Sequence, residues 1–359
     1  MTEARKIEQG SLEYWAQEKP NAIAIIDGER SISYREWNDA ANRVANSLSI
    51  RGITPGDVVV MRTHIRHEWN FIAAALAKLD CSLLGLNWRL TPSEVHYVLG
   101  NSKAHALICD DATPSALIAA TRDLPIKLLV SIDCAEPGFI SYHELLAGEP
   151  TPRYSQKDPP LIIYTSGTTG LPKGVTMGRG SRFFTPEQVL EYQRDVRHAR
   201  RSDAEDPVVL VTMPVHHGAG PSQIWSAQRS GRKMILMRRF DPEQALKLID
   251  RFKVTDWNSV PTMLKRIAGL SKETLAKYDV SSLKHLSVGA APVPYSLKEW
   301  VLDYFGEHCL SEGYGSTETS MVTRLTPEMQ RKKPGSSGTP YKHVSIEGRD
   351  AAGKLLRAN

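Results

Sequence analysis

The chain contains few cysteines and no long apolar run. Its four cysteines, Cys81, Cys109, Cys134 and Cys309, are far apart among 359 residues, and none forms a C-x-x-C pair. This spacing argues against a zinc site and a disulfide scaffold, and it favours a reducing, cytoplasmic location. No segment is long and apolar enough to cross a bilayer, and the first residues lack the apolar core of a signal peptide. The sequence therefore predicts neither secretion nor a membrane span.

A strong charge of one sign is also missing. The chain has 45 Lys and Arg against 40 Asp and Glu, a formal surplus of +5. Such a surplus helps to attract anions, nucleotides included, without indicating a nucleic-acid partner. The basic residues between Arg179 and Arg201 alternate with Glu187, Glu191 and Asp195, which is typical of a solvated helix face. We expect no nucleic acid among the partners.

Apolar runs typical of strands alternate with helical patterns along the chain. Residues 22–27 and 31–34 are predicted to be paired strands, and residues 35–48 an amphipathic helix. This alternation, in a chain longer than one usual domain, predicts an α/β fold of two layered αβα lobes with largely parallel sheets. Proline-rich breaks at residues 150–160 and 331–340 divide the chain. The predicted domains are residues 1–150, 151–335 and 336–359, with a β-hairpin in the last.

The most informative segment is the loop from Tyr164 to Gly174, YTSGTTGLPKG. Its glycines allow backbone N–H groups to surround an anion, its hydroxyl groups donate further hydrogen bonds, and Lys173 adds positive charge. A P-loop NTPase would need G-x-x-x-x-G-K-[ST], but here Pro172 precedes the lysine and a glycine follows it. The segment therefore predicts a phosphate-binding loop of another kind.

Two segments together resemble the signatures of the adenylate-forming superfamily. This superfamily comprises acyl- and aryl-CoA synthetases, peptide-synthetase adenylation domains and beetle luciferases. YTSGTTGLPKGV resembles its phosphate-binding signature, and GYGSTET at residues 313–319 resembles its second signature. The resemblance extends over essentially the whole chain. It implies that Tyr314 packs on adenine, that Thr317 contacts the α-phosphate and that Glu318 helps to hold Mg²⁺.

Other segments match the superfamily less specifically. Residues 289–292, GAAP, resemble the loop beneath the adenine, although the same residues suit an ordinary tight turn. In MPVHHGAG, at residues 213–220, His217 matches the position that orients the acid, and His216 would pack against the substrate channel. Trp225 and Val260 are candidates for the acyl pocket that fit a structural core equally well.

The resemblance thus implies three sets of site residues. The nucleotide-binding set is Thr165, Ser166, Gly167, Thr168, Thr169, Gly170, Lys173, Gly289, Ala290, Ala291, Pro292, Gly313, Tyr314, Gly315, Ser316 and Thr317. The catalytic set is Lys173, His217, Thr317 and Glu318, with Glu318 as the metal ligand. The acyl pocket is lined by His216, His217, Trp225, Val260 and Gly289.

The function that the resemblance implies is activation of a carboxylic acid by ATP and Mg²⁺, followed by transfer of the acyl group to CoA. The superfamily normally continues through a third, barrel-like β subdomain into a small domain with a catalytic lysine. This chain ends at Asn359, so residues 336–359 are expected to be only the start of a truncated β-barrel-like subdomain, and the small domain is absent. We therefore expect an impaired fragment of a longer enzyme. The alternatives are an adenylation domain that loads a carrier protein and a catalytically silent nucleotide-binding module. The sequence does not identify the carboxylic acid or the oligomeric state, and a homodimer is one option.

Overall fold

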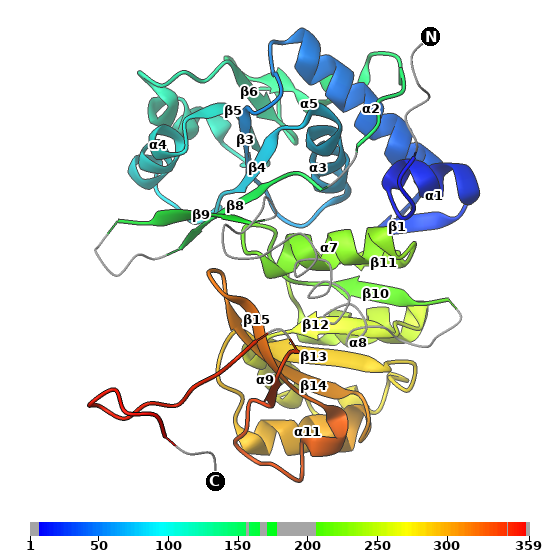
Figure 1. Ribbon diagram of the computed structural model, residues 1–359. Coiled ribbons are helices and arrows are strands. Elements are labelled where there is room, and N and C mark those ends of the chain that lie inside the picture. Colours follow the sequence, from blue (N-terminus) through cyan, green and yellow to red (C-terminus); the bar gives the residue numbers. More distant parts are fainter. Residues whose placement is uncertain (1–6, 156–157, 166–170, 178–205, 343, 357–359) are drawn as a thin grey trace.

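The computed structural model describes residues 7–155, 158–165, 171–177, 206–342 and 344–356. Two largely parallel sheets lie one above the other, with helices between them and on their outer faces (Figure 1). This arrangement confirms the predicted α/β class. Within the described part of the chain, none of the helices combines the length and apolar character needed for a membrane crossing.

The first sheet has the strand order β7-β6-β5-β3-β4-β8-β9. Its pairs are parallel, except that β8 and β9 form an antiparallel hairpin. The strands are β3 (Val58–Arg62), β4 (Ser82–Gly85), β5 (Ala104–Cys109), β6 (Leu128–Ser131), β7 (Ile140–Ser141), β8 (Leu161–Thr165) and β9 (Lys173–Met177). The helices that precede or connect them are α1 (Leu12–Glu18), α2 (Tyr34–Ile50), α3 (His67–Leu79), α4 (Pro92–Asn101) and α5 (Tyr142–Leu146).

The second sheet has the order β16-β15-β14-β13-β12-β10-β11-β1-β2. Its strands are β1 (Ile23–Asp27), β2 (Arg30–Ser33), β10 (Val208–Val211), β11 (Lys233–Leu236), β12 (Asp256–Ser259), β13 (His285–Gly289), β14 (Leu310–Ser316), β15 (Ser320–Leu325) and β16 (Thr339–Pro340). Its helices are α7 (Ala219–Arg229), α8 (Pro242–Phe252), α9 (Pro261–Ala268), α10 (Lys272–Leu275) and α11 (Tyr295–Phe305). Antiparallel pairing occurs at both edges of this sheet, and the strands between them are parallel.

Strand pairing crosses the predicted boundary at residue 150. The N-terminal strand β1 pairs with β11 in the second sheet, where Ile25 lies beside Met234. Conversely, β8 pairs with β4 in the first sheet. The sheets thus do not follow chain order, because apolar burial decides which strands pair. At the C-terminal end, the expected hairpin is reduced to a single bridge between Arg349 and Leu355.

One buried apolar cluster joins the two sheets. It contains Val59 and Met61 from β3, Val209 and Val211 from β10, and Trp69 from α3. Helix α3 is rich in alanine, and most of its residues are buried, so it can lie close to its neighbours. The two sheets therefore share a core. This core fixes where their loops lie relative to one another.

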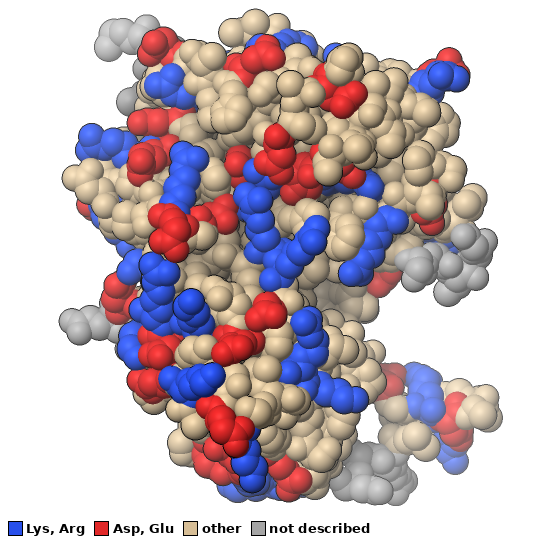
Figure 2. All heavy atoms as spheres, turned by 180° about the vertical axis from the view of Figure 1, so that it is seen from behind, with Lys and Arg blue, Asp and Glu red and all other residues tan. Residues whose placement is uncertain are grey.

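Charges of both signs are interspersed on the surface. On the face that Figure 2 shows, Lys and Arg side chains lie among Asp and Glu side chains, without a large patch of one sign. This mixture agrees with the nearly balanced composition.

Replacing Trp69 should test the shared core. The side chain has 0% of its surface exposed, so Trp69→Ala leaves a large cavity and should lower the free energy of unfolding by about 3–5 kcal/mol. Urea unfolding followed by circular dichroism measures this change. Ile50→Ala is the control, because Ile50 is 84% exposed and its truncation should change the value by no more than about 0.5 kcal/mol. Equal effects of the two substitutions would contradict a core shared through α3.

Candidate functional site

The predicted phosphate loop is the turn of the β8–β9 hairpin. Thr165 pairs with Lys173 across the two strands, and Lys173 is exposed at the base of the turn. A Cβ on Gly174 would lie 3.1 Å from the ring of Tyr164, so glycine leaves room for the ring on this strand pair. A P-loop runs from a strand into a helix, whereas this loop returns as a second strand. Ser166, Gly167, Thr168, Thr169 and Gly170 lie outside the described residues.

Helix α4 fixes both arms of this hairpin. The hydroxyl of Tyr97 donates to the carbonyl of Pro172 at 3.2 Å, and the hydroxyl of Tyr164 donates to Asn101 Oδ1 at 2.5 Å. Burial raises the pKa of Tyr164 to about 12, which keeps its phenol protonated and able to donate. The two bonds hold the residues that flank the loop without using Lys173.

Two glycines bring β13 and β14 close together at the other predicted nucleotide segment. Gly289 pairs with Gly313, and a Cβ on Gly289 would lie 2.4 Å from the Gly313 carbonyl oxygen, so no larger residue fits. The chain then enters an exposed turn through Ala290, Ala291 and Pro292. Ala290 has a left-handed φ of 65°. The turn is open to a ligand on its outer side and leads directly into α11.

The second signature forms the β14–β15 hairpin. Tyr314 is 58% exposed, which leaves a free aromatic face. Ser316 and Thr319 close the turn through reciprocal bonds, including Thr319 N–H to Ser316 Oγ at 3.1 Å and Ser316 N–H to Thr319 Oγ1 at 3.2 Å. Thr317 and the exposed Glu318 occupy this turn.

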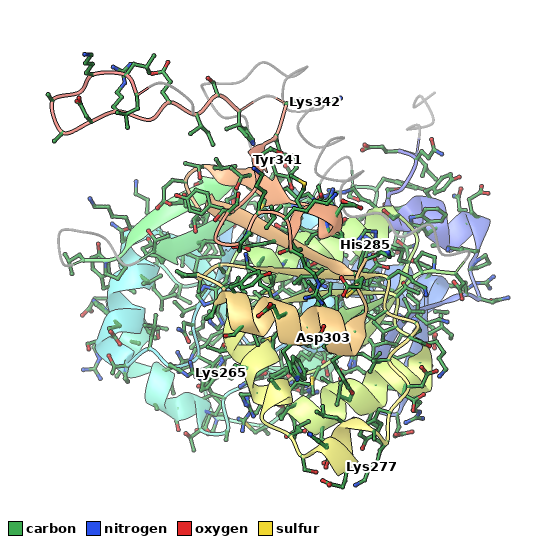
Figure 3. The ribbon with its side chains drawn as sticks, turned by 90° about the horizontal axis from the view of Figure 1, so that it is seen from below. Lys265, Lys277, His285, Asp303, Tyr341 and Lys342 are labelled. Atoms are coloured by element: carbon green, nitrogen blue, oxygen red, sulfur yellow. The ribbon has the colours of Figure 1, made fainter. Side chains whose placement is uncertain are left out.

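Strand β15 can approach β14 closely because Gly315 of β14 has no side chain. A Cβ on Gly315 would lie 2.1 Å from the carbonyl oxygen of Ser320. The tip of the β14–β15 hairpin points toward the β8–β9 hairpin, and both lie on the same side of the molecule (Figures 1 and 3). The structure thus places the flanks of the phosphate loop and the second signature at one side of the two-sheet body.

The histidine loop lies between the end of β10 and α7, against the first sheet. A Cβ on Gly85 would lie 2.8 Å from the Cα of His216, so this loop touches the end of β4. A Cβ on Gly218 would lie 3.2 Å from Met177 Sδ, which places the loop against β9 as well. The loop therefore lies beside the hairpin that carries the phosphate segment.

The two histidines of this loop differ in environment. His216 is buried and His217 is exposed, with ring centroids 4.5 Å apart. Burial, followed by the charges of His217, Arg89 and His64, lowers the pKa of His216 to about 3. His216 is therefore neutral near pH 7 and suits an apolar channel wall, whereas the exposed His217 is accessible to a ligand.

Trp225 and Val260 are less closely tied to the site. Trp225 lies on α7 and packs beside Trp69 of the shared core, with ring centroids 6.3 Å apart. Val260 is partly buried and precedes the first residue of α9. Because Trp225 contacts Trp69, its side chain takes part in the packing of the shared core.

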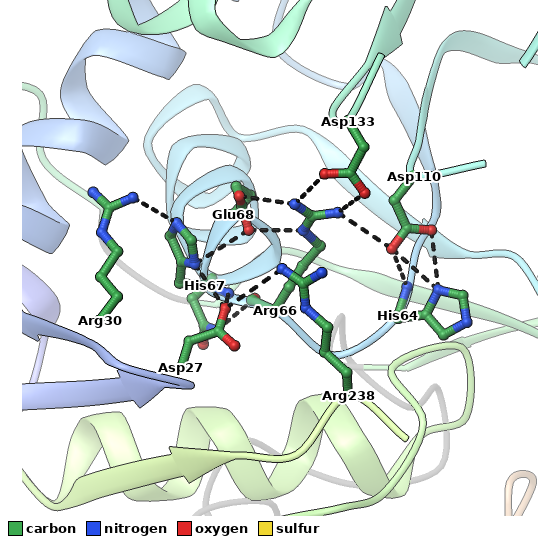
Figure 4. Close-up of polar contacts among 10 residues, drawn as sticks. Asp27, Arg30, His64, Arg66, His67, Glu68, Asp110, Asp133 and Arg238 are labelled. Carbon is green, nitrogen blue, oxygen red and sulfur yellow. Dashed lines mark hydrogen bonds and ion pairs between the residues drawn. The ribbon is translucent and has the colours of Figure 1, made fainter. Parts of the chain in front are cut away.

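A charged network that the sequence analysis missed lies at the junction of the two sheets (Figure 4). Arg66 donates to Glu68 at 2.7 and 2.9 Å and to both oxygens of Asp133 at 2.7 Å. Burial opposes the charge of Arg66, but the bonds to Asp133 and Glu68 outweigh it and raise the pKa of the guanidinium. Asp133 lies 67 residues from Arg66 along the chain, so no local pattern could have identified this pairing.

Asp27, His67 and Glu68 in this network have ligand atoms within 4.8 Å of one another, as a metal site requires. His67 Nδ1 lies 2.7 Å from Asp27 Oδ2, and Arg30 Nη1 lies 2.9 Å from His67 Nε2. Since arginine can only donate, Nε2 accepts from Arg30 and Nδ1–H donates to Asp27. With Glu68 held by Arg66, the ligand atoms are already engaged, and the trio ties β1 to α3.

Known proteins resemble most of the chain in sequence. A sequence model of the family described as AMP-binding enzyme matches residues 12–359. A relative from Oryza sativa subsp. japonica, 4-coumarate--CoA ligase 3, is 28% identical over 90% of this chain and 59% of its own length. The fatty acid--[acyl-carrier-protein] ligase ScoC of Streptomyces coeruleorubidus is 28% identical over 96% of this chain and 65% of its own length. The chain thus spans less than two thirds of these relatives.

A solved structure has the same fold. The N-terminal domain of FACL13 from Mycobacterium tuberculosis, in an inhibitor-bound form, superposes with a TM-score of 0.80 and 25% identity. The match covers 98% of this chain and 86% of that domain.

Because of the charged network, the free energy of unfolding should decrease at acidic pH. Burial opposes ionisation of Asp27 and Glu68, but His67 and Arg66 respectively outweigh it and lower both pKa values below 3.8 and 4.5. Both carboxylates therefore stabilise the folded chain above those values, and this contribution is lost as pH falls through the lower folded-state pKa values.

The test measures the urea midpoint by circular dichroism between pH 7 and about pH 3. The double variant Asp27→Asn/Glu68→Gln should be less stable than the parent at pH 7 and should lose less stability in acid. A parallel decline of both proteins would exclude these two carboxylates as the cause.

Proposed function

Because the chain belongs to the AMP-binding enzyme family of the adenylate-forming superfamily, we propose that it carries the sites at which a carboxylic acid is joined to AMP. The observation that carries this proposal is the position of two glycine-dependent hairpins on one side of the molecule. One presents Lys173, and the other presents Tyr314 and Glu318. A cation, an aromatic face and a carboxylate are the groups that suit a magnesium nucleotide.

Each of these groups has a role that follows from its exposure. The Lys173 ammonium binds phosphate oxygens at the base of its loop, and the Tyr314 ring stacks on the adenine. Glu318 sits in an exposed turn, and a single carboxylate together with phosphate oxygens suits Mg²⁺, which keeps several waters of its own. When bound, the ion would neutralise phosphate charge. Thr317, in the same turn, donates its hydroxyl to the α-phosphate.

The proposed reaction needs no nucleophile from the protein. An oxygen of the substrate carboxylate attacks the α-phosphorus and forms the acyl–phosphate bond of acyl-AMP. The bond from the α-phosphorus to the bridging oxygen breaks, and pyrophosphate leaves with both bonding electrons. His217 orients the acid, while His216, Val260 and Gly289 line its channel. The work of the chain is positioning, charge stabilisation and exclusion of water.

For the second step we propose CoA as the acceptor. The rice relative is named a CoA ligase, whereas the Streptomyces relative is named an acyl-carrier-protein ligase, so a carrier protein is the alternative. The histidine loop, PVHHGAG, has no acidic residue to hold the ammonium of an amino acid, which favours an apolar or ring-containing acid. The proposed location is the cytoplasm, since all four cysteines are free.

Nucleotide binding tests the proposal directly. The chain should bind MgATP in titration calorimetry, and Lys173→Met should weaken this binding about ten- to a hundredfold, because a charge-assisted hydrogen bond is worth about 1.5–3 kcal/mol. Lys277→Met is the matched control, since Lys277 is an exposed lysine at the outer edge of the molecule in Figure 3. Loss of affinity in both variants, or in neither, would count against the assignment.

The role of Glu318 requires a comparison with and without metal. Glu318→Gln should weaken binding of MgATP but leave the weaker binding of ATP in excess EDTA unchanged, because the amide removes the anionic metal ligand. Calorimetric titrations in the two buffers measure the difference. If the parent shows the same affinity in both buffers, Glu318 does not hold magnesium.

The identity of the acid requires a separate measurement. In a thermal-shift panel of acyl-adenosine sulfamates, the matching acyl group should give the largest stabilisation.

A further inference from the structure

A buried ion pair joins α11 to β14, the strand that also carries the exposed Tyr314. Lys298 of α11 and Glu312 of β14 pair with one another, and their side chains are 2% and 9% exposed. Val288 pairs with Glu312 and Leu286 pairs with Leu310 across β13 and β14, and these three apolar residues belong to the buried cluster of the second sheet. Neither charge belongs to the groups proposed above to contact ATP or the acid.

Stability alone does not explain two charges in an apolar core. Transfer of a lysine and a glutamate out of water carries a large desolvation cost, and well-packed apolar residues of similar size often stabilise as much or more. What an ion pair adds is direction, because it holds two elements at one spacing and in one register. The role of the pair therefore depends on which two elements it holds in place.

Both partners lie next to segments of the proposed nucleotide site. Lys298 is in the first turn of α11, and its N–H donates to the carbonyl of Pro294 at 3.2 Å, directly after the exposed turn at residues 290–292. Glu312 precedes Tyr314 by two residues, so both side chains lie on the same face of β14. The backbone of Glu312 also pairs with Val288, which precedes Gly289.

We propose that the Lys298–Glu312 ion pair is a positioning device for adenine recognition. It ties the start of α11 to β14 and thereby sets the spacing between the turn at residues 290–292 and the ring of Tyr314. These two segments are the ones that the resemblance to the superfamily assigns to adenine, so this inference rests on the proposed function. The phosphate hairpin belongs to the other sheet, and the turn that carries Thr317 and Glu318 is closed by its own bonds between Ser316 and Thr319, so we expect the phosphate contacts not to depend on the pair.

The experiment compares two probes that share their phosphates but not their base. ATP and inorganic tripolyphosphate are titrated, each with Mg²⁺, into the parent chain, Lys298→Met, Glu312→Gln and the double variant Lys298→Met/Glu312→Leu. Lys253→Met is the matched control, because Lys253 is 58% exposed in an ion pair with Asp250. Melting temperatures are recorded for all five proteins.

Each single variant should raise the Kd for ATP about tenfold, since stacking of a base on an aromatic ring is worth about 1–3 kcal/mol. The Kd for tripolyphosphate should stay within about twofold of the parent value. The double variant should regain most of the parental melting temperature, because no unpaired charge remains buried, yet it should keep the raised Kd for ATP. If the pair had only a structural role, a variant that regains the melting temperature would also regain the parental Kd for ATP.

Three results would overturn the inference. In the first, the double variant has the parental Kd for ATP. In the second, ATP and tripolyphosphate weaken alike in the variants that fold. In the third, Lys253→Met has the same effect as Lys298→Met. A parent chain that binds tripolyphosphate but not ATP, or neither probe, would instead refute the proposed function itself, and the positioning role with it.

Discussion

The apolar contact between the two sheets is the constraint on which the candidate site depends. The groups of the site are divided between the sheets, with Lys173 on the first and Tyr314 and Glu318 on the second. Neither sheet could hold a nucleotide through both sets of groups unless the spacing between them were fixed. The buried cluster around Trp69 provides this spacing, because side chains of both sheets pack against it at the density of a protein interior.

Close backbone approach then shapes the site itself. Gly289 and Gly315 each face a carbonyl oxygen at a distance that excludes any side chain. The strands can therefore meet at the site without side chains between them, and the space in front of the exposed Tyr314 ring stays open. Gly289 and Gly315 thus have a structural explanation in this chain, which does not depend on any role in touching a ligand.

Local chemistry was predictable from the sequence, and long-range pairing was not. The strands at residues 22–27 and 31–34 and the following helix were predicted because turn residues and periodicity are local, and Ser33 and Glu36 form a capping box where α2 begins. The position of β1 beside β11 depends on burial partners some two hundred residues away. The network around Arg66 was missed for the same reason, since Asp27 and Asp133 become its neighbours only after folding.

Buried charges join structural elements in two different ways in this fold. Arg66 lies between acidic groups that come from different elements, so its charge is shared by a network that joins the sheets. Lys298 and Glu312 instead form a single pair inside one sheet and its helix. A network tolerates small displacements because several bonds share the charge, whereas an isolated pair in an apolar core keeps its energy only at one separation. The isolated pair is therefore the better device for holding a slot of fixed width, and the network is the better one for holding two bodies together.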